Sequence, residues 1–331
     1  MYKVLITGGL GYIGSVACSE LLASGYTVYC LDNLLNSSKN LINEVRKKNF
    51  QFIECDINNF QEVEAVFTKY EFNAVIHLAA IVGDPACKEN SNLAIKTNWD
   101  ASKNLIECAI RYKVKRFVFA STCSNYGKMD TSNEMLNEEA KLSPLSLYAE
   151  LKVRFEKFIL DELDRSSLII PTILRFSTVY GLSPRMRFDL TVNEFCKELY
   201  FGRELIVFGE QFWRPYCHVE DFSNAFKLIL ESPENKVAYN VFNVGCSSEN
   251  YTKKMIINEI SSILSNCKIK YVHQQDDPRD YRVDFTKISK TLGFKISKKV
   301  PMGINEIISS LNDGQFSDCD SQKYYNIDVK K

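Results

Sequence analysis

The chain has 331 residues, of which 45% are hydrophobic and 25% charged, with 41 basic and 41 acidic side chains. This is the composition of an ordinary globular protein with one large domain or two modest ones. The balanced charge argues against a nucleic-acid partner, and no apolar run approaches the ~18 residues that span a membrane.

The N-terminus and the cysteines both indicate an intracellular protein. MYKVLITGG lacks the basic region, long apolar stretch and cleavage site of a signal peptide. The 11 cysteines include no CxxC or CxxH pair, so we interpret them as small buried hydrophobes in a reducing cytosol. We therefore expect a cytoplasmic protein without a metal site or a membrane partner.

The first half of the chain alternates short apolar runs with stretches of helical spacing. This alternation predicts an α/β fold built on a Rossmann-type, doubly wound parallel sheet with right-handed crossovers. The expected strands cover 4–7, 27–32, 50–55, 74–80, 116–120 and 168–176, and the expected helices cover 12–24, 60–70, 91–113 and 146–165.

Beyond residue 180 the pattern changes, because Gly, Pro and Arg cluster in GLSPRMRFD and the following strands are short. We expect helices over 189–201, 220–231 and 252–265 and a strand over 238–244. This half predicts a smaller C-terminal substrate domain that interleaves with the sheet. The expected division is a first domain over 1–180, to which later segments return, a mainly substrate-binding domain over 181–315 and a flexible polar tail over 316–331.

The segment TGGLGYIG joins the first expected strand to the first expected helix and carries Gly8, Gly11 and Gly14 at three-residue spacing. A dinucleotide needs a tight turn there, close backbone approach to its pyrophosphate and a helix N-terminus aimed at it. Asp32 ends the next strand, where a carboxylate accepts hydrogen bonds from ribose hydroxyls and repels a 2′-phosphate. No Arg follows in LDNLLNSS. We therefore predict NAD rather than NADP, the alternative being that Asp32 is only a turn residue.

Further along, Asp56 follows the third strand, where it either reaches the adenine or forms an Asx turn or helix N-cap. His77 lies inside an apolar strand and is predicted to be a packed core histidine. The complete set of expected cofactor-binding residues is Gly8, Gly11, Tyr12, Ile13, Gly14, Asp32, Asn33, Asp56, Ile57, Leu78, Ala79, Ala80, Asn98, Tyr148 and Lys152.

Tyr148 and Lys152 stand four residues apart in a stretch of helical character, YAELKVRFEKFIL. Positions i and i+4 share a helix face, so the two side chains are predicted to project together. A nearby ammonium favours the tyrosinate and lowers the pKa of the phenol, and a positive nicotinamide ring adds to this. The pair therefore predicts a general base for a substrate hydroxyl, the alternative being a solvated helix face.

TGGLGYIG, HLAA, STCSNYG and YAELK, followed by LRFSTVYG, WRPYCHVED, FNVG and DPRDYRVDF, together resemble the extended short-chain dehydrogenase/reductase family. The resemblance covers most of the chain and implies an NAD-dependent enzyme acting on a nucleotide-activated sugar. It implies that Tyr148 is the base and that Lys152 is its partner and a ligand of the nicotinamide ribose. It also implies that Thr122 hydrogen-bonds the reacting oxygen of the sugar.

Cys123 and Ser124 stand where dehydrating and decarboxylating members of that family carry Asp-Glu or Ser-Glu. That Glu removes the proton at C5, a task for which serine has no accessible pKa. We therefore expect oxidation at C4 without a second base and consider a 4,6-dehydratase the weaker reading. Cys123 remains open as a C5 base or as a small packed residue.

Two fates of a 4-keto sugar remain open. It leaves as product in a C4 dehydrogenase, or it is reduced on its other face in a 4-epimerase. SPRMRFD and WRPYCHVED resemble a bacterial subgroup that works on surface-polysaccharide sugars and includes oxidation at C4 of a GDP-linked heptose. On that resemblance we expect a dehydrogenase for a GDP- or UDP-linked hexose or heptose, with the epimerase as the alternative. A non-catalytic NAD sensor would lack Tyr148 or Lys152, and both are present.

Arginines are suited to bind the diphosphate of the nucleotide-activated sugar, because the guanidinium presents forked donors. Arg214 and Arg282 are the first choices, Arg185 and Arg187 follow, and each could instead form a surface salt bridge. The complete set of expected substrate-binding residues is Cys123, Ser124, Asn125, Arg185, Arg187, Asn193, Arg214 and Arg282. The resemblance also implies a homodimer, or a dimer of dimers, formed through the helices within 91–113 and 148–165.

Overall fold

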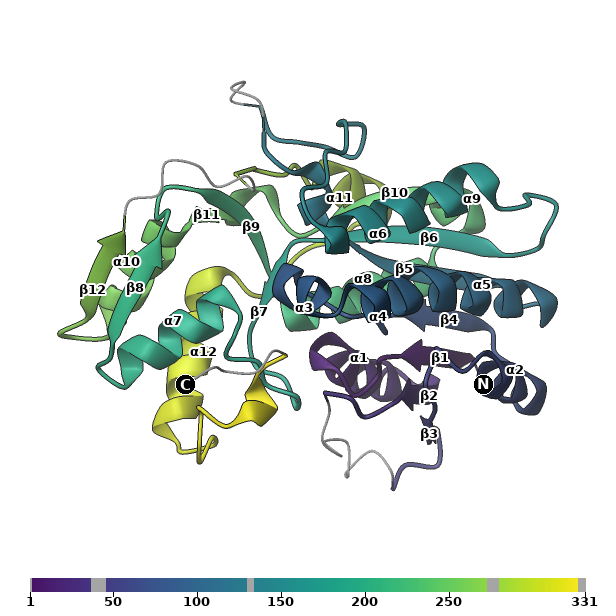
Figure 1. The fold of residues 1–331 in the computed structure, drawn as a ribbon, viewed down its shortest axis with the longest axis horizontal. Coiled ribbons are helices and arrows are strands. Elements are labelled where there is room, and N and C mark those ends of the chain that lie inside the picture. The colour runs from purple at the N-terminus through teal and green to yellow at the C-terminus, as the bar shows by residue number, and fades with distance from the viewer. Residues whose placement is uncertain (1, 37–45, 130–133, 273–279, 327–331) are drawn as a thin grey trace.

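The computed structural model describes residues 2–36, 46–129, 134–272 and 280–326. Its main sheet has seven strands in the order β10-β6-β5-β4-β1-β2-β3, and every pairing within it is parallel. This confirms the predicted doubly wound α/β fold (Figure 1). The strands are β1 (Lys3–Thr7), β2 (Thr27–Asp32), β3 (Phe50–Glu54), β4 (Ala74–His77), β5 (Arg116–Thr122), β6 (Ile170–Phe176) and β10 (Asn240–Val244).

Helices cover both faces of this sheet because alternate side chains of a strand point to opposite faces. In β1, Val4 and Ile6 belong to one core cluster and Leu5 to the other. The first cluster includes α1 (Tyr12–Ala23) and α8 (Val219–Glu231). The second includes α2 (Phe60–Lys69), α5 (Ser102–Arg111) and α6 (Leu147–Lys157).

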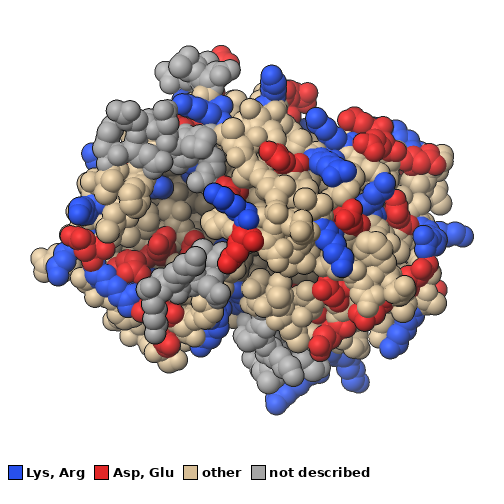
Figure 2. Space-filling model, viewed as in Figure 1, with Lys and Arg blue, Asp and Glu red and all other residues tan. Residues whose placement is uncertain are grey.

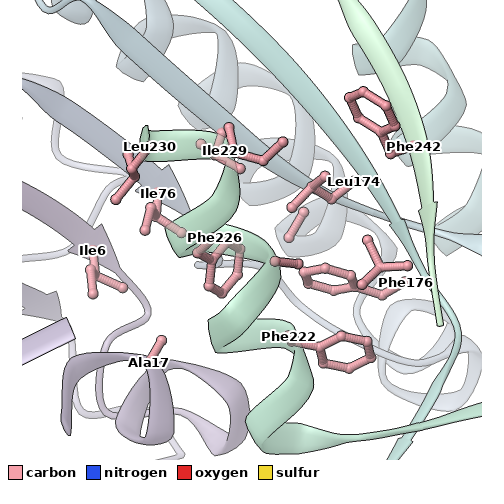
Figure 3. Packing of buried hydrophobic residues seen from close by; sticks show 14 of the residues in the cluster. Ile6, Ala17, Ile76, Leu174, Phe176, Phe222, Phe226, Ile229, Leu230 and Phe242 are labelled. Carbon is pink, nitrogen blue, oxygen red and sulfur yellow. The ribbon is translucent and has the colours of Figure 1, made fainter. Parts of the chain in front are cut away.

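α8 comes from the second half of the chain, yet it packs beside α1 and against the strands (Figure 3). Phe222 stacks on Phe176 of β6 with ring centroids 4.2 Å apart. Phe226 meets the same Phe176 edge-on at 5.7 Å. Burying aromatic rings of this size contributes about 1.5–3 kcal/mol each, so α8 is an integral part of the sheet domain.

Several expected elements differ in their bounds. The helix expected over 91–113 is divided into α4 (Ser91–Ile95), a π-helical segment (Lys96–Ala101) and α5. The strand expected over 74–80 ends at His77, after which the chain turns to border a cavity. The strand expected over 238–244 starts at Asn240, because α9 (Glu234–Val237) precedes it and Tyr239 takes a positive φ of 55°.

The smaller lobe is built from short strands and three longer helices, with a core that includes Phe195, Ile256 and Ile304. Its strands are β7 (Thr178–Tyr180), β9 (Trp213–His218) and β11 (Asn250–Thr252) in one sheet and β8 (Glu204–Phe208) and β12 (Lys268–Val272) in another. Its helices are α7 (Thr191–Tyr200), α10 (Lys253–Ile263) and α12 (Val300–Asn312), and α3 (Asp84–Glu89) and α11 (Thr286–Leu292) complete the fold.

The polar segment after α12 packs against α7 as far as residue 326, which does not fit the flexible tail expected over 316–331. Phe316 and Tyr324 both contact the ring of Phe188 at 5.3 Å between centroids. Asp320 accepts hydrogen bonds from Lys197 and Arg203. The few aromatic residues of the segment and its ion pairs anchor it, although its composition is polar. Residues 327–331 lie outside the described part.

No helix within the described ranges has the length and apolar character needed to cross a membrane. Basic and acidic side chains are interspersed over the face that Figure 2 shows.

Candidate active site

A cavity of about 520 Å³ lies at the carboxyl ends of the parallel strands, where open α/β sheets bind their ligands. Its size falls within the ~300–1,000 Å³ common for ligand sites. Its lining includes predicted residues from both ends of the site: Gly8, Gly11, Tyr12, Ile13, Gly14, Asp32, Asn33, Asp56, Ile57, Leu78, Ala79, Ala80, Thr122, Tyr148, Lys152, Arg185 and Arg187.

The glycine turn has the shape that a dinucleotide needs. Gly8 has a φ of +69°, and a Cβ there would lie 2.8 Å from the backbone nitrogen of Ala79. A Cβ on Gly14 would meet the carbonyl oxygen of Gly8 at 2.1 Å, so only glycine lets α1 start this close to the turn. The first turn of α1 leaves backbone N–H groups without intrahelical partners. These residues fit the diphosphate of NAD.

Asp32 borders the same cavity and also holds the turn around it. Its Oδ2 accepts from Leu10 N at 3.1 Å, and its Oδ1 accepts from Leu34 N at 2.9 Å. The two readings of Asp32, ribose ligand and turn residue, are therefore compatible.

Asp56 likewise lines the cavity while its Oδ1 accepts from Asn58 N at 2.9 Å, which is an Asx turn. Asn98 does not line the cavity. Its side chain instead bonds both backbone groups of Ile81, at 2.8 and 2.9 Å, and so positions a residue that does. His77 is the core histidine expected: Thr7 and Ser102 bond its two ring nitrogens, and burial lowers its pKa to about 3.

Tyr148 and Lys152 lie on one face of α6, as predicted, with the Lys152 Nζ 5.8 Å from the centre of the Tyr148 ring. Ser146 caps this helix by accepting from Ala149 N. The Lys152 ammonium donates to the carbonyl of Ala120 at 2.7 Å. Thr122 ends β5 at the cavity wall, and its Oγ1 accepts from Ser124 N at 3.1 Å. The three predicted catalytic residues thus line one cavity.

The pKa of Tyr148 differs from the expectation. Burial raises the pKa of the phenol, Cys87 and Asp84 add to this, and Arg187 opposes it. The expected net lowering is wrong for the ligand-free protein, because loss of hydration disfavours the phenolate more than nearby cations favour it. Burial also lowers the pKa of Lys152 to about 8.

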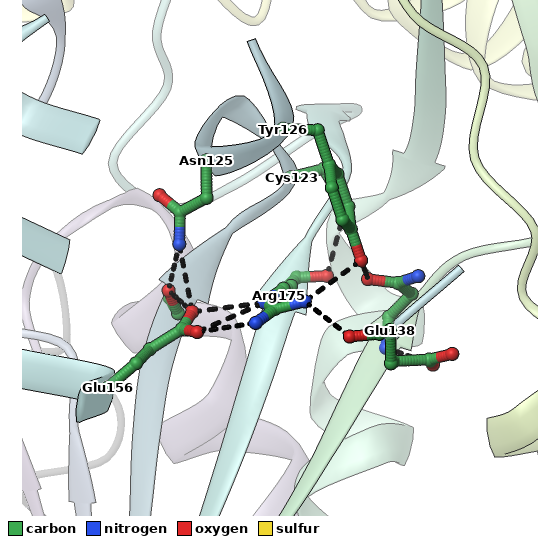
Figure 4. A network of polar contacts seen from close by, with 8 residues as sticks. Cys123, Asn125, Tyr126, Glu138, Glu156 and Arg175 are labelled. Atoms are coloured by element: carbon green, nitrogen blue, oxygen red, sulfur yellow. Dashed lines mark hydrogen bonds and ion pairs between the residues drawn. The ribbon is translucent and has the colours of Figure 1, made fainter. Parts of the chain in front are cut away.

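A network of buried polar groups lies behind the STCSNYG loop (Figure 4). Arg175 of β6 donates to Glu156 Oε2 at 2.7 Å, to Glu156 Oε1 at 3.2 Å and to Tyr126 Oη at 3.1 Å. Asn125 Nδ2 donates to Glu156 Oε1 at 2.8 Å. The loop is therefore held from behind by a buried ion pair.

Of the three loop residues expected at the substrate, none lines the cavity. The thiol of Cys123 is buried, donates to the Arg175 carbonyl at 3.3 Å and has a pKa well above its usual value, raised first by burial. This favours the packed-residue reading of Cys123 over the C5 base. Asn125 is fully buried in the network, and Ser124 is half-buried beside Thr122.

The predicted arginines divide into two pairs. Arg185 and Arg187 line the cavity, whereas Arg214 and Arg282 lie outside its lining, over the rings of Tyr281 and Trp213 respectively. Asn193 is fully buried, and its amide donates to Tyr12 Oη at 3.0 Å and to the carbonyl of Arg187 at 2.8 Å. Roles for these residues at a substrate stay predictions.

Some residues that line the cavity were not predicted from the sequence. Ser177 follows β6 directly, so the end of that strand could have indicated it. Asn36 and Asn326 come from polar segments without a recognisable pattern. Within the described ranges, no three His, Cys, Asp or Glu side chains gather as a metal site.

Comparison with known proteins agrees with this geometry. Residues 4–245 match the model of the NAD dependent epimerase/dehydratase family. The chain is 28% identical to the UDP-glucose 4-epimerase of Bacillus subtilis over 320 residues, covering 89% of this chain and 92% of the relative. It is 32% identical to the UDP-glucuronate 4-epimerase of Thermodesulfobacterium geofontis over 295 residues, covering 86% and 88%.

Among solved structures, the UDP-glucose 4-epimerase of Thermotoga maritima with UDP-glucose superposes with a TM-score of 0.84 at 26% identity, covering 95% of this chain and all of that one. The UDP-glucuronic acid 4-epimerase of Bacillus cereus, in complex with UDP-glucuronic acid and NAD, superposes with a TM-score of 0.83 at 25% identity, covering 94% and 99%. The chain is an NAD-dependent enzyme and belongs to the NAD dependent epimerase/dehydratase family.

Proposed function

We propose that this protein is a 4-epimerase of a nucleoside-diphosphate sugar, with a UDP-sugar as the first candidate. The observation that carries the proposal is the placement of Thr122, Tyr148 and Lys152 in one cavity with the glycine turn and Asp32. The relatives described above from Bacillus subtilis and Thermodesulfobacterium geofontis are named as 4-epimerases of UDP-sugars. They favour the epimerase, which the sequence analysis held as the alternative, over the C4 dehydrogenase.

In this proposal Tyr148 takes the proton of the C4 hydroxyl while Thr122 holds the oxygen, and Tyr148 returns the proton once the sugar has turned. Arg187 favours the phenolate form of Tyr148, which opposes the effect of burial. Lys152 holds a ribose hydroxyl of the cofactor. When bound, NAD supplies the hydride acceptor and donor that make oxidation and re-reduction at C4 possible.

The described residues that line the cavity include no carboxylate placed to act as a base at C5. In the described part of the chain, the carboxylates in its lining are Asp32 and Asp56, both at the nucleotide end. Glu138, a half-buried carboxylate that follows the STCSNYG loop in the chain, accepts from the backbone nitrogen of Asn243 at 2.7 Å and does not line the cavity. This supports chemistry at C4 alone and argues against a 4,6-dehydratase.

The test is incubation of the protein with NAD and UDP-glucose, UDP-glucuronic acid or a GDP-linked hexose or heptose in deuterated water, followed by proton NMR. We expect inversion at C4 without enzyme-dependent deuterium at C5 and without NADH accumulation, and Tyr148→Phe serves as the control. Stoichiometric NADH with a 4-keto sugar would instead establish the C4 dehydrogenase. Rapid deuterium uptake at C5 would contradict both readings.

A further inference from the structure

Arg185 is a buried cation on the cavity wall that forms no ion pair with any carboxylate in the described part of the chain. Its side chain is 4% exposed. Its Nε donates to the carbonyl of Asn36 at 2.9 Å and its Nη2 to the carbonyl of Tyr325 at 3.4 Å, both neutral acceptors. No carboxylate of the described residues forms an ion pair with it. A buried guanidinium in that state predicts an anionic ligand, because an unpaired charge is costly to bury.

Among the described residues, the other two cations in the cavity lining have different surroundings. Arg187 is bidentate with Asp189, at 2.9 and 2.6 Å. Lys152 lies at the catalytic end, beside Tyr148. Arg185 is therefore the lining cation available to an anion at the nucleotide end. Burial, and then the neighbouring charge of Arg187, lower its pKa to about 10, although the more distant carboxylates of Asp189 and Asp32 oppose this.

The backbone around Arg185 is tied to the first turn of α1, where a dinucleotide places its diphosphate. Ser183 Oγ donates to the carbonyl of Tyr12 at 2.7 Å and lies 3.0 Å from Ser15 Oγ. The same Ser183 Oγ accepts from the backbone nitrogen of Arg185 at 3.2 Å. Arg185 is thus fixed next to the N-terminus of the helix that would bind the diphosphate.

The segment after α12 completes this arrangement from the other side. The carbonyl of Tyr324 accepts from Phe188 N at 3.1 Å, and that of Tyr325 accepts from Arg185. The Tyr325 hydroxyl accepts from Lys197 at 2.6 Å, and Lys197 also binds Asp320. Asn326 follows directly and lines the cavity.

We propose that Arg185, held in place by residues 316–326, binds the diphosphate of the NAD cofactor. This reassigns Arg185 from the sugar nucleotide, where the sequence analysis placed it, to the cofactor. It also makes the C-terminal segment a part of the cofactor site. The proposal does not depend on whether the enzyme is an epimerase or a dehydrogenase.

The first test compares cofactor fragments on the full-length chain freed of retained cofactor. Calorimetry with ADP-ribose, which carries both phosphates, should show about 10- to 100-fold weaker binding to Arg185→Gln, as for one lost charge-assisted hydrogen bond. Adenosine, which lacks phosphate, should bind both proteins equally in a competition assay. Lys254→Gln removes an exposed positive charge of α10 outside the cavity lining and should change neither affinity.

Binding of UDP and GDP tests whether Arg185 contacts the diphosphate of the sugar nucleotide instead of the diphosphate of the cofactor. If Arg185→Gln weakens UDP or GDP and leaves ADP-ribose unchanged, the residue serves the sugar nucleotide and the proposal is wrong. Equal losses for ADP-ribose and adenosine would also overturn it, because the effect would then not be on the phosphates.

The second test addresses the C-terminal segment. A chain ending at Gly314 should bind ADP-ribose more weakly, and adding Arg185→Gln should cause little further loss, because the segment acts through that side chain. Asp320→Asn loosens the same segment with a smaller change and replaces the truncation if the shortened chain does not fold. Independent, additive losses would show that the segment does not act through Arg185.

Discussion

Buried cations lie both in the network behind the STCSNYG loop and in the wall of the cavity, and their surroundings differ. Behind the loop, burial alone would lower the pKa of Arg175, but the paired carboxylate of Glu156 raises it well above the usual value. In the cavity wall, Lys152 and Arg185 have neutral carbonyls as hydrogen-bond acceptors, and burial lowers the pKa of each.

The comparison distinguishes a buried cation that stabilises the fold from a buried cation that can bind a ligand. A buried cation whose anion is supplied by the chain has nothing to offer a ligand, and its removal is felt in folding. A buried cation without such an anion is stabilised when an anionic ligand arrives. The network in Figure 4 and the cavity lining should therefore respond to substitution in opposite ways.

The largest expected effect is on the cavity side. Tyr148→Phe removes the proton acceptor and keeps the packed ring, so turnover should fall by ~10²–10⁴-fold. The melting temperature and NAD affinity should stay at their wild-type values. Steady-state kinetics measures the turnover, and calorimetry measures the melting temperature and the NAD affinity. A loss below about tenfold would mean that another group acts as the base.

The next effect is on the network side. Glu156→Ala leaves Arg175 buried and unpaired, so the free energy of unfolding should fall by about 3–5 kcal/mol in urea titrations. Glu150→Ala, an exposed position of the same helix, should change it by less than about 0.5 kcal/mol.

Removing both charges, as Glu156→Leu with Arg175→Met, should recover part of the stability lost in Glu156→Ala. If Glu156→Ala is as stable as the wild-type protein, the network does not hold the loop, and the contrast between the two regions fails.

The third effect is the pH dependence of stability. In the cofactor-free protein the pKa of Lys152 is about 8, below its ordinary value of 10.5. Between these values the unfolded chain binds more protons than the folded one, so Lys152 makes stability rise with pH, by up to ~1.4 kcal/mol per pH unit. Below pH 8 its unfavourable contribution is constant.

Lys152→Met should remove this rise, and urea titrations of both proteins between pH 8 and 10 would detect it. If the free energy of unfolding changes with pH in the same way for both proteins, the pKa of Lys152 is not lowered in the folded state.

The smallest effect concerns Asp32. We expect the wild-type protein to bind NAD more tightly than NADP, and Asp32→Ala should narrow that preference by about tenfold through loss of a charged hydrogen-bond acceptor. Asp32→Asn removes the charge and keeps one acceptor oxygen, so it preserves only one of the two bonds from Leu10 N and Leu34 N. Equal or tighter binding of NADP by the wild-type protein, measured by calorimetry, would refute the assignment.

Local patterns in the sequence predicted the parts of the site that depend on neighbours along the chain. The spacing of Gly8, Gly11 and Gly14 predicted the turn, since steric limits at each position act within a few residues. The four-residue interval between Tyr148 and Lys152 predicted their shared face. The sequence could not predict which of the six Arg and Asn candidates for substrate binding line the cavity, because this depends on which distant segments of the chain meet.

The sequence by itself determined the alternation of strands and helices, the parallel sheet, the glycine turn and the shared helix face of Tyr148 and Lys152, because periodicity and backbone sterics operate over short distances. Tertiary structure alone decided three other features. It paired Arg175 with Glu156 while leaving Arg185 with neutral partners. It raised the pKa of Tyr148, because the degree of burial is a property of the packed molecule. It also brought Asn326 into the cavity wall, because ion pairs and aromatic contacts between segments far apart in the chain anchor the polar C-terminal segment.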